Sequence, residues 1–103
     1  MNERLNKLQA MLEKSLADPF LLYCIAMEYK KAGQHDEAVR YFDRTLQADE
    51  GYCYAYFQKG QTLELDGKNA DARLAYEQGI AMAKKKGDLH AASEIEGALS
   101  MLE

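Results

Sequence analysis

The chain has 103 residues, a length typical of one domain, and its 48% hydrophobic content with a single proline is typical of globular proteins rather than disordered ones. Thirteen basic and 17 acidic residues give a net charge of −4, which argues against binding to nucleic acid or to an anionic membrane surface. No apolar run approaches the roughly 20 residues that span a bilayer, and the amino-terminal residues lack the apolar region of a signal peptide.

The cysteines favour a reducing compartment. Cys24 and Cys53 lie far apart, without a CxxC pattern and without histidines at the spacing of metal ligands. Zinc sites and disulfide frameworks usually show clustered cysteines or histidines, which this sequence lacks. We therefore expect unpaired thiols, a cytoplasmic location and no metal or other cofactor.

Residues 3–16 are expected to form an amphipathic helix. Apolar side chains recur there at steps of three and four, which places them on one helical face: Leu5, Leu8, Met11, Leu12 and Leu16. Asp18 followed by Pro19 then predicts the cap and the first residue of a second helix.

The second and third helices form the first unit of a repeat. The second helix ends at Gly33 and carries one apolar face: Leu22, Ile25, Ala26 and Tyr29. The third begins near Asp36, ends around Asp49 to Gly51 and carries another: Ala38, Val39, Phe42 and Leu46. Gly33 allows the positive φ that ends a helix and lets the next one fold back antiparallel to it.

The chain then matches itself at an offset of 34 residues. This offset aligns Ala26 with Gly60, Gly33 with Gly67, Ala38 with Ala72, Phe42 with Tyr76 and Leu46 with Ile80. A period of this size is typical of stacked helical hairpins. The repeats are therefore expected at residues 19–52 and 53–86, with the second built from helices at about 54–66 and 69–85.

A last helix is expected within residues 88–102, capped by Asp88. Its apolar face comprises Leu89, Ala92, Ile95, Leu99 and Leu102. The first and last helices can cover the apolar ends of the stack. The expected fold is therefore all-α, a single domain of about six helices arranged as a helical-repeat solenoid.

These repeats resemble the tetratricopeptide repeat (TPR), which asks for large, small and aromatic residues at fixed positions of a helical hairpin. The pattern is filled once by Leu22, Ile25, Ala26, Tyr29, Ala38 and Phe42, and again by Tyr56, Gly60, Leu63, Ala72 and Tyr76. The resemblance covers about residues 19–86. The sequence departs from the pattern in having no tryptophan and in carrying Lys59, Thr45 and Gly79. The resemblance predicts close helix contacts at Ala26, Ala38, Gly60 and Ala72, where a larger side chain would overpack the interface.

Another face of the first helix of each repeat is a candidate binding surface. In TPR proteins these helices line a concave groove, so the resemblance implies that a peptide-binding groove is formed by Phe20, Tyr23, Met27, Tyr54, Phe57, Gln58 and Gln61. Aromatic and methionine side chains suit such a surface. Tyr23 and Phe57 are expected to stand in solvent in the unbound protein. The alternative is that these aromatics are core residues, or that a flanking helix covers the groove.

Nothing in the sequence favours catalysis. His35 and His90 are far apart and neither belongs to a recognisable nucleophile motif. The expected function is a non-catalytic protein-protein interaction module, an adaptor or scaffold that binds a peptide or helix of a partner protein in the groove. The alternative is an assembly element that forms a homodimer through the same groove or an end face.

Overall fold

The computed structural model describes residues 2–15 and 17–102 and contains six α-helices. They are α1 (Glu3–Lys14), α2 (Pro19–Lys31), α3 (His35–Ala48), α4 (Cys53–Leu65), α5 (Asn69–Lys86) and α6 (Leu89–Ser100). The described residues contain no strand, and none of their helices is long and apolar enough to cross a membrane. The predicted all-α fold is confirmed, whereas Leu16, assigned to the first helix, lies outside the described residues.

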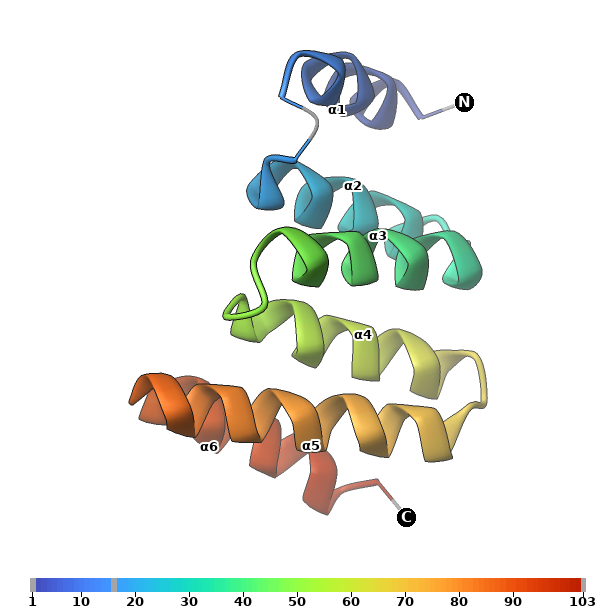
Figure 1. Cartoon of the computed structure of the whole chain (residues 1–103). Helices are drawn as coiled ribbons and strands as arrows, with labels where there is room; N and C mark the ends of the chain where they lie inside the picture. The colour runs from blue at the N-terminus through green and yellow to red at the C-terminus, as the bar shows by residue number, and fades with distance from the viewer. Residues whose placement is uncertain (1, 16, 103) are drawn as a thin grey trace.

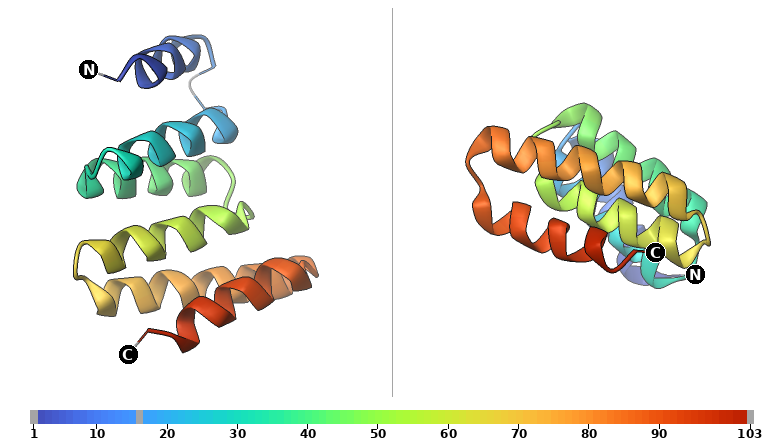
Figure 2. Two further views of the ribbon diagram at one scale, coloured as in Figure 1. Left: turned by 180° about the vertical axis from the view of Figure 1, so that it is seen from behind. Right: turned by 90° about the horizontal axis from the view of Figure 1, so that it is seen from below.

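The helices stack as antiparallel hairpins. α2 packs against α3 and α4 against α5, while α1 and α6 lie at the two ends of the stack (Figure 1). α4 also contacts α2 and α6, so these three helices form one layer, with α3 and α5 on the other side (Figure 2). α6 therefore extends the layer of α2 and α4 rather than lying across it.

The caps and stops explain where the helices begin and end. The Asp18 carboxylate accepts a hydrogen bond from the Phe20 backbone N–H at 2.9 Å, and Asp88 accepts one from Ala91 at 3.1 Å. Gly33 and Gly67 adopt φ of 77° and 76°, in the left-handed region that glycine enters without strain. The predicted caps and turn glycines are thus confirmed.

Small residues set the distance between paired helices. Ala26, Ala38 and Ala72 are fully buried, as the repeat pattern predicts. Gly60 lies directly under the buried ring of Tyr76, so that a Cβ atom at this position would overlap the ring. A Cβ atom on Gly79 would lie 2.7 Å from the Cβ atom of Tyr56, which explains glycine at a position where alanine is common.

The predicted apolar faces are wrong at two positions. Met11 of α1 and Leu89 of α6 are exposed, although most of the described residues on the same faces are buried. With about 100° of rotation per residue, both side chains lie roughly 90° or more from the centre of the buried face. Each of these helices lies at an end of the stack, so only its central stripe is covered.

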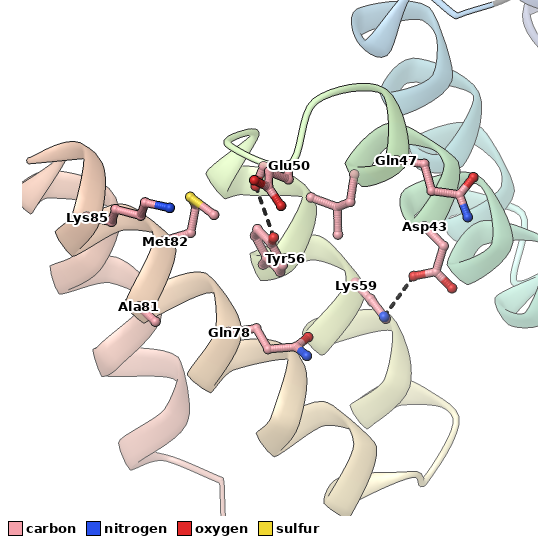
Figure 3. Close-up of a pocket in the computed structure, with 10 residues that line it drawn as sticks. Asp43, Gln47, Glu50, Tyr56, Lys59, Gln78, Ala81, Met82 and Lys85 are labelled. Carbon is pink, nitrogen blue, oxygen red and sulfur yellow. Dashed lines mark hydrogen bonds and ion pairs between the residues drawn. The ribbon is translucent and has the colours of Figure 1, made fainter.

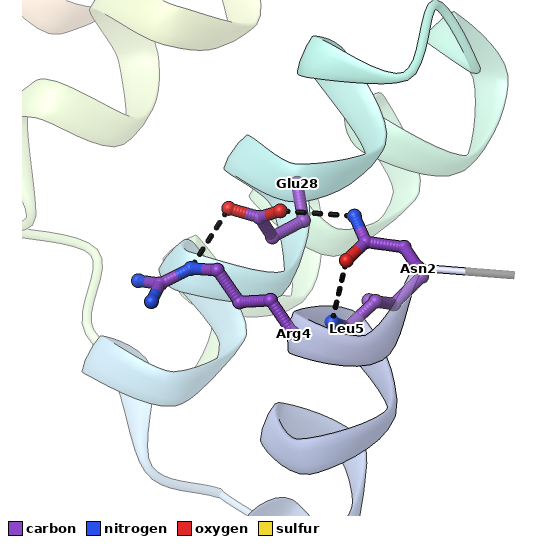
Figure 4. Close-up of polar contacts among 4 residues, drawn as sticks. All are labelled: Asn2, Arg4, Leu5 and Glu28. Carbon is purple, nitrogen blue, oxygen red and sulfur yellow. Dashed lines mark hydrogen bonds and ion pairs between the residues drawn. The ribbon is translucent and has the colours of Figure 1, made fainter.

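A polar cluster joins α1 to the repeats (Figure 4). Glu28 of α2 is buried, with its side chain only 10% exposed, and its carboxylate accepts hydrogen bonds from Asn2 Nδ2 at 2.9 Å and Arg4 Nε at 3.0 Å. Asn2 Oδ1 also accepts from the Leu5 backbone N–H and caps α1. The hydrogen bond from Asn2 is the largest of the effects that lower the pKa of Glu28. The carboxylate therefore holds the start of α1 beside the end of α2.

We predict that Gly60→Ala lowers the free energy of unfolding by about 1–3 kcal/mol, because the added methyl group must displace the Tyr76 ring from a filled core. Urea denaturation followed by circular dichroism measures the change. Gly97→Ala is the matched control, since a Cβ atom on this α6 glycine meets no atom within 4 Å. The same substitution should be neutral or stabilising there. Equal stabilities of the parent and Gly60→Ala would show that α4 and α5 do not approach as described.

A second prediction concerns the pH dependence of stability. Since the pKa of Glu28 is lowered in the folded state, its stabilising contribution is complete above the unfolded-state pKa of about 4.3 and is lost as the pH falls through the folded-state pKa. Glu28→Gln should therefore be less stable than the parent at pH 7, and the difference should shrink towards pH 3. Urea denaturation at each pH tests this, with Glu13→Gln, an exposed α1 carboxylate, as control. A difference that is constant with pH would contradict an ionic role for Glu28.

Candidate functional site

The predicted groove residues all lie on α2 and α4, but they divide into packed and accessible side chains. Phe20 is 60% exposed, whereas the others are partly buried: Tyr23, Met27, Tyr54, Phe57, Gln58 and Gln61. Partial burial has different causes along the surface. The contacts of each side chain decide which of them remain available to a ligand.

Tyr23 and Phe57 are partly buried against other aromatic rings. The Tyr23 ring stacks on Tyr52 with centroids 5.0 Å apart and meets Phe42 edge to face at 5.8 Å. Phe57 packs at 6.4 Å from the rings of both Tyr54 and Tyr76. Burial also raises the pKa of the Tyr23 hydroxyl. The expectation that these two rings stand in solvent is therefore wrong, because their length lets them reach side chains of adjoining helices.

Tyr54 connects α4 to α6. Its hydroxyl donates a hydrogen bond to Glu94 Oε1 at 2.6 Å, and this hydrogen bond is the main reason that the Tyr54 pKa rises to about 12. His90 Nε2 lies 3.1 Å from the same Glu94 oxygen. The Tyr54–Glu94 hydrogen bond thus joins α6 to α4, and the His90 contact lies within α6. Tyr54 belongs to this connection as well as to the predicted surface.

Lys30 of α2 joins Gln58 and Gln61 of α4 across the same surface. Its ammonium donates to Gln58 Oε1 at 2.6 Å and to Gln61 Oε1 at 3.0 Å. Partial burial lowers the pKa of Lys30. The helical spacing places Lys30 on this face, one turn beyond Met27, but sequence reasoning did not identify it as a candidate binding residue. The two glutamines are therefore held in position by a cation from the preceding repeat.

Two adjoining hollows lie at the carboxyl ends of α2 and α4 and share Lys30 and Leu65. One, of about 420 Å³, is lined by Met27, Glu28, Lys30, Lys31 and Leu65. The other, of about 400 Å³, is lined by Lys30, Gln61, Glu64 and Leu65. We call this pair the α2/α4 hollow. Leu65 is 64% exposed there, and no sequence pattern selects it, since only its proximity to Met27 and Lys30 makes it part of a surface.

A larger hollow of about 660 Å³ lies on the opposite side, between α3 and α5, with α4 beneath it (Figure 3). Lys59 enters it and pairs with Asp43 at 2.7 Å, while the Tyr56 hydroxyl donates to the Glu50 carbonyl at 3.0 Å. The departure of Lys59 from the repeat pattern is thereby explained, because its ammonium faces this outer hollow instead of the core. Its formal charges balance locally, and no part of it was predicted from the sequence.

Possible catalytic groups do not come together. His35 Nδ1, at the α2–α3 turn, lies 3.4 Å from Asp66 Oδ1, at the α4–α5 turn, whereas His90 contacts Glu94 on α6. Over residues 2–15 and 17–102, no group of three or more His, Cys, Asp or Glu residues is arranged to hold a metal ion. Cys24 and Cys53 are free thiols, and burial raises the pKa of both. None of these thiols and histidines forms a nucleophile and base pair in the structure.

Comparison with known proteins identifies relatives over almost the whole chain. No family model matches it. A TPR repeat-containing protein of Pseudomonas aeruginosa is 30% identical over 96 residues, which cover 93% of this chain and 91% of the relative.

Solved structures show the same arrangement of helices. A Bordetella parapertussis protein, determined in solution, matches with a TM-score of 0.85 and 30% identity over 99% of this chain and 89% of its own. A tetratricopeptide repeat domain protein of Salinibacter ruber, determined by NMR, matches with a TM-score of 0.78 and 30% identity over 84% of this chain and 87% of its own. With the paired hairpins, the turn glycines and the buried small residues, these relatives show that the chain belongs to the tetratricopeptide repeat family.

Proposed function

We propose that the chain is a non-catalytic protein-interaction module that binds a peptide or a helix of a partner protein across α2 and α4. Membership of the TPR family supports an interaction role, and the relatives are named as TPR proteins without a stated ligand. The observation that carries the proposal is the set of accessible apolar side chains on one surface of α2 and α4. This set comprises Phe20, Met27 and Leu65. Together with Lys30 and Gln61, these residues form what we call the α2/α4 surface.

The packed aromatics prepare this surface for binding. Tyr23 and Phe57 fix α2 and α4 relative to the surrounding helices, and Lys30 ties the two helices together through Gln58 and Gln61. A ligand therefore meets side chains that are already held in place, which lowers the entropy lost on binding.

The length of the surface sets the size of the ligand. Phe20 and Met27 are separated by about two turns of α2, or roughly 10 Å along the helix axis. An extended peptide covers this distance with about three residues, and a helix covers it with about two turns. The surface thus suits a short segment of a partner, anchored by two or three large apolar side chains.

Self-association is the second proposal. Leu89 and Met101, near the two ends of α6, are strongly exposed and lie at the carboxyl-terminal end of the stack. A second copy could bury this end face or the α2/α4 surface itself. Sedimentation at increasing protein concentration separates the two proposals, because an adaptor remains monomeric and an assembly element does not.

We predict that Phe20→Ala combined with Leu65→Ala abolishes peptide binding without unfolding the protein. The probe is a displayed library of random 12-residue peptides, selected on the parent protein and then measured as soluble peptides by fluorescence anisotropy. Each truncated anchor should weaken binding by a factor of ten or more, since anchors commonly contribute about 2 kcal/mol. Both side chains are mostly exposed, so their loss should change the melting temperature little.

Leu74→Ala is the matched control, because Leu74 is exposed on α5 and lines the outer side of the stack. This variant should bind the selected peptides as the parent does. Unchanged binding by the Phe20 and Leu65 double variant, or lost binding by Leu74→Ala, would place the ligand on a different surface. If the double variant loses helicity as well as binding, Phe20 and Leu65 have structural roles instead.

A further inference from the structure

Lys30 is a partly buried cation whose hydrogen-bond partners are all neutral. Its ammonium contacts the amide oxygens of Gln58 and Gln61, and no carboxylate of the described residues lies within ion-pair distance. By contrast, Lys59, which is also partly buried, pairs with the Asp43 carboxylate. Hydrogen bonds to amide oxygens hold an ammonium in place but leave its charge uncompensated.

Two acidic residues line the same hollow as Lys30, and each is held by another contact. Glu28 and Glu64 line the α2/α4 hollow, and both belong to other contacts. The Glu28 carboxylate accepts from Asn2 and Arg4, and the Glu64 carboxylate accepts from the Tyr76 hydroxyl. Glu28 uses both carboxylate oxygens in this way and Glu64 uses one, and neither carboxylate forms an ion pair with Lys30. Lys30 is therefore left without an ion-pair partner among the described residues.

The remaining donors point to a carboxylate ligand. An ammonium has three N–H donors, and Gln58 and Gln61 use two of those of Lys30. Lys31 contributes a second cation to the lining of the same hollow. Lys30 is partly buried, so water screens its charge less than that of a fully exposed lysine, and its attraction to an anion is stronger. The same loss of solvation lowers the Lys30 pKa.

Apolar surface adjoins this cation. Met27 and Leu65 line the hollow beside Lys30, and Leu65 is largely exposed. An occupant that matches both features carries an acidic side chain next to a large apolar one. A free inorganic anion would leave the apolar part of the hollow uncovered, and an uncharged apolar segment would leave Lys30 without a counterion.

We propose that the α2/α4 hollow recognises an aspartate or glutamate side chain of the partner segment through Lys30, with an adjacent large apolar side chain seated on Met27 and Leu65. The inference rests on the proposed peptide-binding function and specifies the chemistry of the ligand. The recognised group is a side-chain carboxylate within the segment, so a free carboxyl terminus is not required.

The test begins with the library of displayed 12-residue peptides, whose carboxyl termini are fused to the carrier and therefore carry no terminal carboxylate. Peptides selected on the parent should contain an acidic residue at a fixed spacing from a large apolar one. The tightest is synthesised with an amidated carboxyl terminus, and a second version replaces its acidic residue by the corresponding amide. A third version keeps the acidic residue and has a free carboxyl terminus. All are measured against the parent, Lys30→Met and Lys7→Met.

Lys30→Met retains the length of the apolar stem and removes the charge, and Lys7→Met removes an exposed charge from α1 as the matched control. The acidic peptide should bind Lys30→Met about tenfold or more weakly than it binds the parent or Lys7→Met, as is usual for loss of a charge-assisted hydrogen bond. The amide peptide should bind the parent and Lys30→Met equally. This difference between the two peptides isolates the pairing from any general effect on folding.

The outcomes separate the inference from the proposed function. If selected peptides bind at Phe20 and Leu65 but lack a common acidic residue, the proposed carboxylate subsite is wrong. The same holds if Lys30→Met weakens binding of the acidic and the amide peptides equally. In both cases the proposed peptide-binding surface is retained. If only the version with a free carboxyl terminus depends on Lys30, side-chain recognition is also wrong. A parent protein that selects no peptide at all contradicts both proposals.

Discussion

The close approach of the paired helices is the constraint on which the rest of the structure depends. Gly60 admits the Tyr76 ring against the backbone of α4, and Ala26 and Ala38 are fully buried in one cluster with Phe42 between α2 and α3. Neither contact can accept a larger side chain without displacing a neighbour that is itself buried. The 34-residue period of the sequence repeats this contact, and successive hairpins stack because each presents the same surface to the next.

This packing also decides which residues remain accessible. Tyr23 and Phe57 pack against the rings of Phe42 and Tyr76 on the partner helices of their own hairpins. The candidate surface is therefore formed by Phe20, Met27 and Leu65. Lys30 links α2 to α4 in the same region without acquiring a carboxylate partner among the described residues. The contacts that stabilise the stack therefore leave a small apolar and cationic surface on one side of it.

The sequence predicts well those features that depend on local interactions. The caps at Asp18 and Asp88, the turn glycines and the small buried residues follow from helix periodicity and backbone conformation, and all are found in the structure. The contacts of Tyr23 could not be predicted in this way, because Tyr52 lies in the connection that leads into α4 and only the stacking of the hairpins brings the two rings together. The same applies to the pairing of Glu28 with Asn2 and Arg4, and to the position of Leu65 beside Lys30. Residues that come from different helices and follow no repeat have no signature in a single sequence.

Binding across α2 and α4, and not in the larger hollow between α3 and α5, is the central claim about function. Its most direct test is the change in backbone amide chemical shifts of the ¹⁵N-labelled protein when a selected peptide is added. We predict that the largest changes cluster around Phe20, Met27, Gln61 and Leu65. Changes centred instead on the outer hollow, at Leu46, Gln78 and Met82, would contradict this claim.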